Sequence, residues 1–174
     1  MRNGFKWFIL LLVAIVPLIG IYIVNNPMLM TEVLVDTGGF AKGESLPLMT
    51  GEDVTGGKVD ISAYQGKSFV VMMAKIDCET CKSSYPMLQQ WQANYPNTPL
   101  VMLGVGTKDE YAQVKRKMNF QFPLVTLDDE KQNLYRMKIT PVFYLIDASG
   151  KVADRMNGYR VKEFQAFMER ATAQ

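Results

Sequence analysis

The chain has 174 residues, 48% hydrophobic and 21% charged, so it can bury a core and is not a disordered tail. The net charge is +2, and Arg2 and Lys6 account for it because residues 1–24 contain no acidic side chain. A body without net charge is atypical of nucleic-acid-binding proteins, so no such partner is expected. With no His and two Cys, the chain excludes His-based triads, His metal sites and Cys₄ zinc sites.

Residues 7–24 are apolar and uncharged. As a helix they would span about 27 Å, close to the hydrocarbon thickness of a bilayer. Because basic residues precede this segment and none follows closely, the positive-inside rule predicts a cytoplasmic N-terminus and an extracytoplasmic body. A cleaved signal peptide is the alternative, but residues 25–28 offer no A-x-A-like cleavage site. We expect a single-pass anchor in the lipid bilayer of the inner membrane, with the body on the periplasmic side.

The body is expected to alternate strands and helices. Strands are predicted at residues 46–49, 59–61, 69–74, 100–105, 124–127, 142–146 and 152–156. Helices are predicted from Cys78 to Tyr95, around residues 111–118, from Asp128 to Tyr135, and at residues 164–171. This order predicts an α/β fold with a central mixed sheet flanked by helices. The expected organisation is residues 1–6 in the cytoplasm, 7–24 as anchor, 25–43 as tether and 44–174 as the folded domain.

Cys78 and Cys81 form the one C-x-x-C motif, directly after the buried strand and at the start of a helix. The free amides and the dipole of a helix N-terminus stabilise a thiolate, so Cys78 is the predicted nucleophile. Cys81, one turn further on, would resolve a mixed disulfide. Half of a metal site, or two inert core thiols, are the alternatives. The polar residues around the pair argue against inert thiols, and a metal site would need ligands from a second chain.

The motif, Pro86 five residues after it, Thr140-Pro141 before a strand, and the hairpin at Gly150 together resemble the thioredoxin superfamily. Residues 64–67, the additional strand and helix between residues 100 and 118, and residues 122–124 resemble its membrane-anchored TlpA/ResA-like branch. The resemblance covers about residues 44–172. It implies a thioredoxin-like fold and a cis bond before Pro141.

The resemblance also implies a function, a membrane-anchored extracytoplasmic thiol–disulfide oxidoreductase. Such an enzyme reduces disulfides in exported proteins, for example during maturation of cytochrome c or other metalloproteins. Thr140 and Pro141 would orient the substrate chain. We expect no cofactor and no metal, because the redox-active pair of Cys78 and Cys81 is sufficient for the reaction. A membrane thiol electron donor would re-reduce the pair.

The sequence departs from the family beside the motif. Asp77 stands where the family usually has Trp, and Ser84 stands where some cytochrome c-maturation members have Glu. Asp77 and Glu79 place two carboxylates beside Cys78, where they would raise the pKa of its thiol and favour a reducing couple. Two solvated charges without a role are the alternative reading of this pair.

Three other functions remain open from the sequence. A dithiol oxidase or isomerase would use the same cysteines to introduce disulfides. A copper chaperone would use both sulfurs as soft ligands. A peroxidase is disfavoured, because the residues just before Cys78 include no Thr, Ser or Arg to activate a peroxide.

Overall fold

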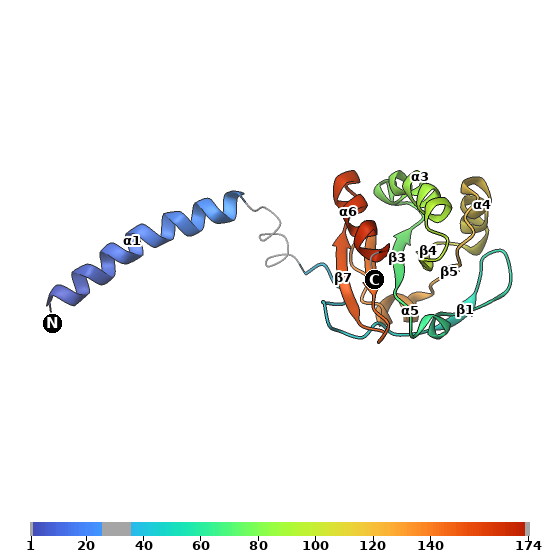
Figure 1. Ribbon diagram of the computed structural model, residues 1–174, viewed down its shortest axis with the longest axis horizontal. Helices are drawn as coiled ribbons and strands as arrows, with labels where there is room; N and C mark the ends of the chain where they lie inside the picture. The colour runs from blue at the N-terminus through green and yellow to red at the C-terminus, as the bar shows by residue number, and fades with distance from the viewer. Residues whose placement is uncertain (1, 26–35, 173–174) are drawn as a thin grey trace. The chain divides into compact units, whose positions relative to one another are not determined.

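The computed structural model describes residues 2–25 and 36–172, without the side chains of residues 2–5, 9, 10 and 23. The chain divides into two compact units between Thr37 and Gly38 (Figure 1). The second unit therefore begins six residues before the predicted boundary at residue 44. Most of the predicted tether, residues 26–35, lies outside the described residues.

The first unit contains helix α1, Arg2–Asn25. Its described large apolar side chains are exposed, from 42% at Ile15 to 78% at Val24. Within the described part of the chain, no helix combines the length and the apolar character that crossing a membrane requires. Residues 7–24, the predicted transmembrane span, lie within α1.

The second unit is built on a five-stranded sheet in the order β5-β4-β3-β6-β7. Strands β3, β4 and β5 run parallel, whereas β6 and β7 pair antiparallel. The sheet strands are β3 (Phe69–Lys75), β4 (Leu100–Val105), β5 (Leu124–Thr126), β6 (Val142–Ile146) and β7 (Val152–Asn157). A separate hairpin pairs β1 (Thr50–Glu52) with β2 (Lys58–Asp60). The predicted mixed α/β architecture is confirmed.

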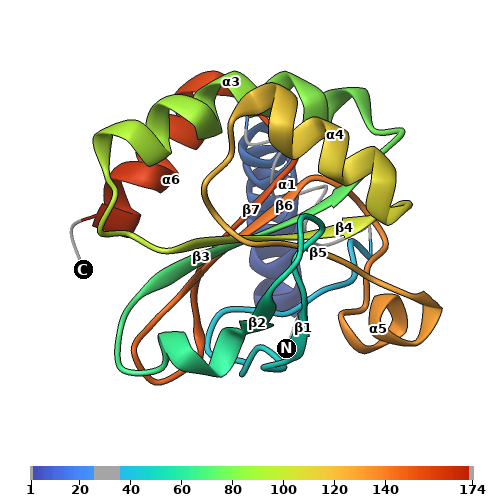
Figure 2. The ribbon, with the colours of Figure 1, turned by 90° about the vertical axis from the view of Figure 1, so that its right-hand side faces the viewer.

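Helices cover both faces of this sheet (Figure 2). One face carries α3 (Glu79–Asn94), α4 (Lys108–Met118) and α6 (Val161–Thr172), and the other carries α5 (Asp129–Leu134) and the short 3₁₀ helix η1 (Ile61–Tyr64). The two faces alternate along β3: Val70, Met72 and Ala74 join the core under α3, α4 and α6, while their neighbours join the opposite core. This period-2 pattern explains why a continuous apolar run forms a strand buried on both faces.

The first predicted strand, residues 46–49, is wrong, because the hairpin strand starts at Thr50 instead. Leu46 is buried without lying in a strand, and Pro47 has no N–H to donate to a ladder. The carbonyl of Pro47 instead accepts a hydrogen bond from the Tyr135 hydroxyl at 2.7 Å. Side-chain burial, rather than strand pairing, thus accounts for the apolar run at 46–49.

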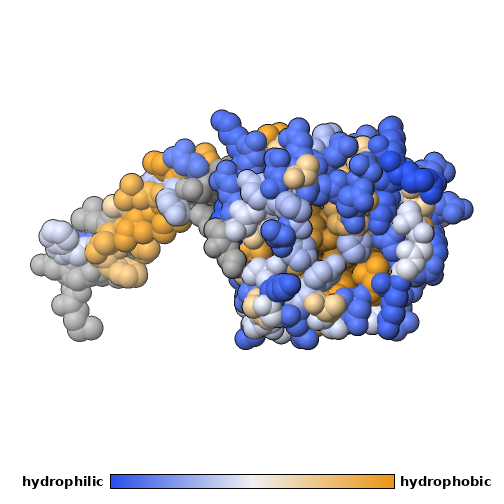
Figure 3. Space-filling view, turned by 45° about the vertical axis from the view of Figure 1, so that its right-hand side comes forward, coloured by the Kyte–Doolittle hydropathy of each residue, from blue (hydrophilic) through white to orange (hydrophobic). Residues whose placement is uncertain are grey.

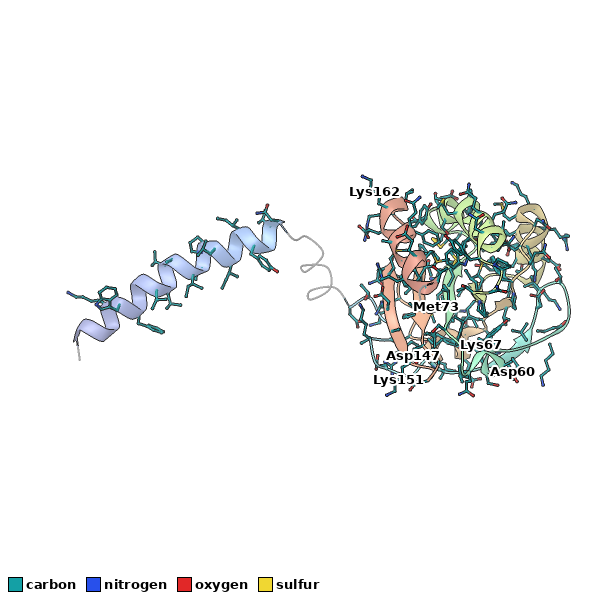
Figure 4. The ribbon with its side chains drawn as sticks, viewed as in Figure 1. Asp60, Lys67, Met73, Asp147, Lys151 and Lys162 are labelled. Atoms are coloured by element: carbon teal, nitrogen blue, oxygen red, sulfur yellow. A yellow bond between two sulfur atoms is a disulfide. The ribbon has the colours of Figure 1, made fainter. Side chains whose placement is uncertain are left out.

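Strand direction brings two distant segments to one edge of the sheet. The C-terminal end of β3, followed by Cys78, lies beside the start of β6, which follows Pro141, because these strands are antiparallel. Lys67, before β3, and Asp147, after β6, mark the opposite end of the sheet (Figure 4). The topology therefore predicts that Cys78 and Pro141 are neighbours.

Candidate active site

Cys78 and Cys81 are joined by a disulfide at the start of α3, with their Cα atoms 5.2 Å apart. Cys78 is the N-cap residue of the helix, in an extended conformation, and is half-buried. Cys81 lies in the first turn and is fully buried. Only the first sulfur is therefore placed to meet another protein, and the order of attack and resolution stays a prediction.

The N-terminus of α3 interacts directly with the sulfur of Cys78. The backbone N–H of Cys81 donates to Cys78 Sγ over 3.1 Å. A sulfur in this cap position receives both a hydrogen bond and the positive end of the helix dipole, and both favour a thiolate when the disulfide is reduced. The local backbone therefore supplies the activation that the sequence predicted for Cys78.

Thr140 and Pro141 face the disulfide from the start of β6. The peptide bond between them is cis, as predicted. The carbonyl oxygen of Thr140 lies 3.6 Å from Cys78 Sγ, where a reduced thiol could donate a hydrogen bond to it. On the other side, the Pro141 carbonyl accepts a hydrogen bond from the N–H of Gly158 at 2.8 Å, which ties this segment to the end of β7.

The two acidic neighbours of Cys78 are placed differently from one another. Both Asp77 and Glu79 are exposed. Glu79, with a side chain that is 83% exposed, pairs with Lys82 Nζ at 2.6 Å. A carboxylate already matched by an ammonium opposes a nearby thiolate less, so the structure weakens the predicted tuning role of Glu79. Asp77 has no such ion pair among the described side chains.

Sequence reasoning assigned no site role to three residues behind the motif. Ser84 is buried, and its hydroxyl donates to the Cys81 carbonyl at 2.7 Å. Burial raises the pKa of Tyr85 to about 12. Burial also raises the pKa of Tyr111, and the charges of Tyr85 and Asp77 raise it further. Helical spacing carries no information about whether a buried hydroxyl finds a partner, so the sequence offers no reason to single out either tyrosine.

A metal site was the alternative reading of the two cysteines. In the described ranges, no group of three or more Cys, Asp or Glu side chains is arranged to hold a metal ion. The arrangement that remains is one accessible sulfur, one buried sulfur, and a carbonyl facing the accessible one. Its chemistry is exchange between this disulfide and external thiols or disulfides.

Comparison with known proteins agrees with this geometry. Residues 42–155 match the AhpC/TSA family over more than half of the chain. The chain belongs to the AhpC/TSA family.

The predicted resemblance to ResA-like proteins is confirmed by curated relatives. The thiol-disulfide oxidoreductase ResA of Bacillus subtilis is 25% identical over 123 residues, covering 68% of each chain. ResA of Geobacillus kaustophilus is 23% identical over 137 residues, covering 76% of this chain and 79% of the relative.

Solved structures of similar proteins show the same fold. A thiol:disulfide interchange protein of the thioredoxin family from Chlorobium tepidum superposes with a TM-score of 0.67 at 21% identity, over 76% of this AhpC/TSA chain and 99% of that chain. A secreted disulfide oxidoreductase of Mycobacterium tuberculosis, homologous to E. coli DsbE, has a TM-score of 0.64 at 21% identity, over 72% and 96%. The predicted thioredoxin-like fold is confirmed.

Proposed function

We propose that this AhpC/TSA-family chain is a thiol–disulfide oxidoreductase that reduces disulfides in exported proteins. One observation carries the proposal: the Cys78–Cys81 disulfide presents a half-buried first sulfur opposite the Thr140 carbonyl and keeps the second sulfur buried. The names of the relatives agree with this enzyme class. Cytochrome c or another metalloprotein with paired cysteines is the example of a substrate that the family resemblance offers.

The proposed exchange proceeds in two steps and needs no cofactor. The thiolate of reduced Cys78 attacks one sulfur of the substrate disulfide, and the other substrate sulfur leaves as a thiolate. The thiolate of Cys81 then attacks Cys78 Sγ, releases the second substrate thiolate and closes the Cys78–Cys81 disulfide. Two electrons have passed to the substrate, which takes up two protons. A membrane thiol donor restores the dithiol by the reverse exchange.

Trapping tests the assigned order of the two sulfurs. Cys81→Ser leaves Cys78 free to attack but removes the resolving thiol, so mixed disulfides with partner proteins should accumulate. They should appear on non-reducing gels of membranes and disappear with dithiothreitol. Cys78→Ser is the matched control and should trap nothing, since Cys81 is buried. Adducts that form with Cys78→Ser and not with Cys81→Ser would reverse the roles.

A dithiol oxidase is the second candidate, and one contact favours it. The hydrogen bond from the Cys81 N–H to Cys78 Sγ stabilises the thiolate, and a stable thiolate makes a couple more oxidising. The Thr140 carbonyl acts in the opposite direction, because its oxygen lies 3.6 Å from the same sulfur, and we propose that the carboxylate of Asp77, the residue directly before Cys78, adds to this effect. We give the second effect more weight, since two groups contribute to it and burial of the sulfur adds to them.

We also propose, from the sequence pattern, that residues 7–24 anchor the chain in the inner membrane with the catalytic domain on the periplasmic side. Apolar side chains are exposed along α1 (Figure 3, orange). By their sequence, residues 7–24 are apolar and uncharged, and such a segment favours an apolar environment like that of the bilayer core. The two basic residues before the segment, Arg2 and Lys6, favour a cytoplasmic N-terminus.

Protease accessibility tests the anchor and its orientation. Protease added to spheroplasts should digest the domain that carries Cys78, and the mature chain in the membrane fraction should still contain Arg2. A chain that stays protected until the membrane is lysed would contradict the orientation. A soluble product that begins after residue 20 would contradict the anchor.

A further inference from the structure

The segment of residues 38–46, which we call the N-terminal brace, crosses beside the loop of residues 137–141, here called the Pro141 loop. Gly38 forms an antiparallel bridge with Met137, the first residue of that loop. The N–H of Gly39 donates to the carbonyl of Arg136 at 2.8 Å. The brace is therefore paired with the chain immediately before the Pro141 loop.

The same brace also contacts the chain immediately after the loop. The N–H of Phe40 donates to the hydroxyl of Tyr144, in β6, at 3.2 Å. The Phe40 ring, which is buried, meets the ring edges of Tyr135 and Tyr144 at centroid distances of 6.4 and 6.2 Å. One buried side chain thus touches residues on both sides of the Pro141 loop, nine positions apart in the sequence.

The side chain of Arg136 contacts two residues of the brace, and we call this pair of contacts the Arg136 clamp. Its guanidinium lies 4.7 Å from the centre of the Phe40 ring and 3.3 Å from a carboxylate oxygen of Glu44. Its backbone adopts φ +49°, which is uncommon for a residue with a side chain. Contacts that hold a residue in an unfavourable conformation fix the direction in which the chain leaves it.

The brace is itself fixed to the sheet. The N–H of Gly43 donates a hydrogen bond to the carbonyl of Val152 at 2.8 Å. The N–H of Leu46 donates to the carbonyl of Gly150 at 3.2 Å. The side chain of Leu46 is buried in the same core cluster as Phe40. A segment docked on the start of β7 and in the core can act as a rigid support for the loop that it touches.

We infer that the N-terminal brace positions the Pro141 loop, and through it the Thr140 carbonyl, opposite Cys78. The inference rests on the proposed exchange function and adds a positioning role for Gly38, Gly39, Phe40 and Arg136. None of these residues touches the sulfur. They act through the loop, whose Thr140 carbonyl oxygen lies 3.6 Å from Cys78 Sγ.

Glycine substitutions provide a sharp test. A Cβ on Gly39 would collide with the Tyr144 hydroxyl, whereas a Cβ on Gly43 would meet nothing within 4 Å. Both residues have positive φ, +70° and +85°, so Gly43→Ala adds similar backbone strain in the same segment without pushing on β6. Gly43→Ala is therefore the matched control for Gly39→Ala.

Alkylation of Cys78 and reduction of insulin, both measured on the full chain in detergent, report on the geometry around the Cys78 sulfur. Displacing the Thr140 carbonyl uncovers Cys78, so iodoacetamide should alkylate reduced Cys78 at least about threefold faster in Gly39→Ala. Reduction of insulin should lose about tenfold in kcat/KM, mainly through KM, because a protein substrate needs the loop in place. Exchange with bis(hydroxyethyl) disulfide, which is too small to need the loop, should not fall. Gly43→Ala should match the wild-type chain within about twofold in all three.

Arg136→Gln keeps the test decisive if Gly39→Ala fails to fold. It removes the clamp at a half-exposed position and should shift alkylation and insulin reduction in the same directions, by about threefold. Lys108→Gln, which removes another surface ion pair, to Glu52, is its control. Wild-type behaviour of Arg136→Gln in both assays would overturn the inference. A wild-type chain that reduces no disulfide would instead refute the proposed function, and the alkylation rates would still decide on the brace.

Discussion

At the scale of single residues, the two sulfurs differ in exposure, and that difference supports the roles proposed for them. Cys78 is half-buried at a helix cap and receives the Cys81 N–H, while Cys81 is buried beneath it. The sequence order alone predicted this assignment. It could not predict that Glu79 pairs with Lys82, because the direction of an exposed side chain at the first turn depends on which partner it finds. A tuning role of Asp77 stays a prediction, and no ion pair of its carboxylate is seen among the described side chains.

Tyr85 offers a stability test behind the motif. Its hydroxyl is buried and has no hydrogen-bond partner among the described residues, and burial raises its pKa to about 12. Tyr85→Phe removes an unpaired polar group, so we expect the free energy of unfolding to rise by about 0.5–1 kcal/mol in urea titrations.

The matched substitution is Tyr135→Phe. That hydroxyl donates to the Pro47 carbonyl at 2.7 Å, so its removal leaves a partner unpaired and should cost about 1 kcal/mol. If both substitutions destabilised the protein equally, the Tyr85 hydroxyl would have a partner in solution.

At the scale of elements, the β1–β2 hairpin is fastened to the sheet by one buried carboxylate. Asp53, in the hairpin turn, accepts hydrogen bonds from the Leu124 N–H at 2.9 Å and from Thr55, and pairs with Lys115 Nζ at 2.6 Å. Burial alone would raise the pKa of Asp53, but the hydrogen bonds from Lys115, Thr55 and Leu124 outweigh burial and lower it below the usual range. The hairpin, β5 and α4 are thus joined by an ionised group.

This arrangement predicts a pH dependence of stability. A carboxyl group whose folded pKa lies below its unfolded value of 3.8 stabilises the fold above that pH. The contribution is lost as the pH falls through the lower, folded pKa. Asp53→Asn should therefore lower the free energy of unfolding by about 1–3 kcal/mol at pH 7, and the difference from wild type should shrink below about pH 4.

The control for this prediction is Glu52→Gln, at the residue directly before Asp53 in the same hairpin. Glu52 pairs with Lys108 at the surface, so its replacement should change stability by less than about 1 kcal/mol at any pH. A difference between Asp53→Asn and wild type that stays constant from pH 7 to pH 3 would show that the Asp53 charge does not contribute.

At the scale of the whole molecule, the sequence predicted the parts whose signal is local and repeated. The strand predicted at residues 69–74 and the helices predicted at residues 164–171 and from Asp128 to Tyr135 carry such signals, and each is confirmed as β3, α6 and α5. The brace could not be predicted. Residues 38–43 contain three glycines and show no period, and Phe40 is buried only because it meets Tyr135 and Tyr144, about a hundred positions away.

Contacts between residues far apart in the sequence also limit what the sequence could predict of the site. The C-x-x-C spacing and the position after a buried strand identified Cys78 and Cys81, and the family resemblance identified Pro141. The distance from the Thr140 carbonyl to Cys78 depends instead on how β3, β6 and the brace pack together. The direction of electron flow depends on that distance and on the charges around Cys78, so it is the property that most needs measuring.

The equilibrium of the Cys78–Cys81 pair with dithiothreitol and glutathione buffers tests the proposed reductant most directly. The fraction of dithiol in the purified chain, read by thiol alkylation at each buffer ratio, gives the reduction potential. The Thr140 carbonyl disfavours the thiolate, and we propose that Asp77 does so too, so we predict a potential below about −180 mV, toward the value of about −270 mV of reducing thioredoxins. A potential above about −180 mV, in the range of isomerases and oxidases, would contradict the account and favour the dithiol oxidase.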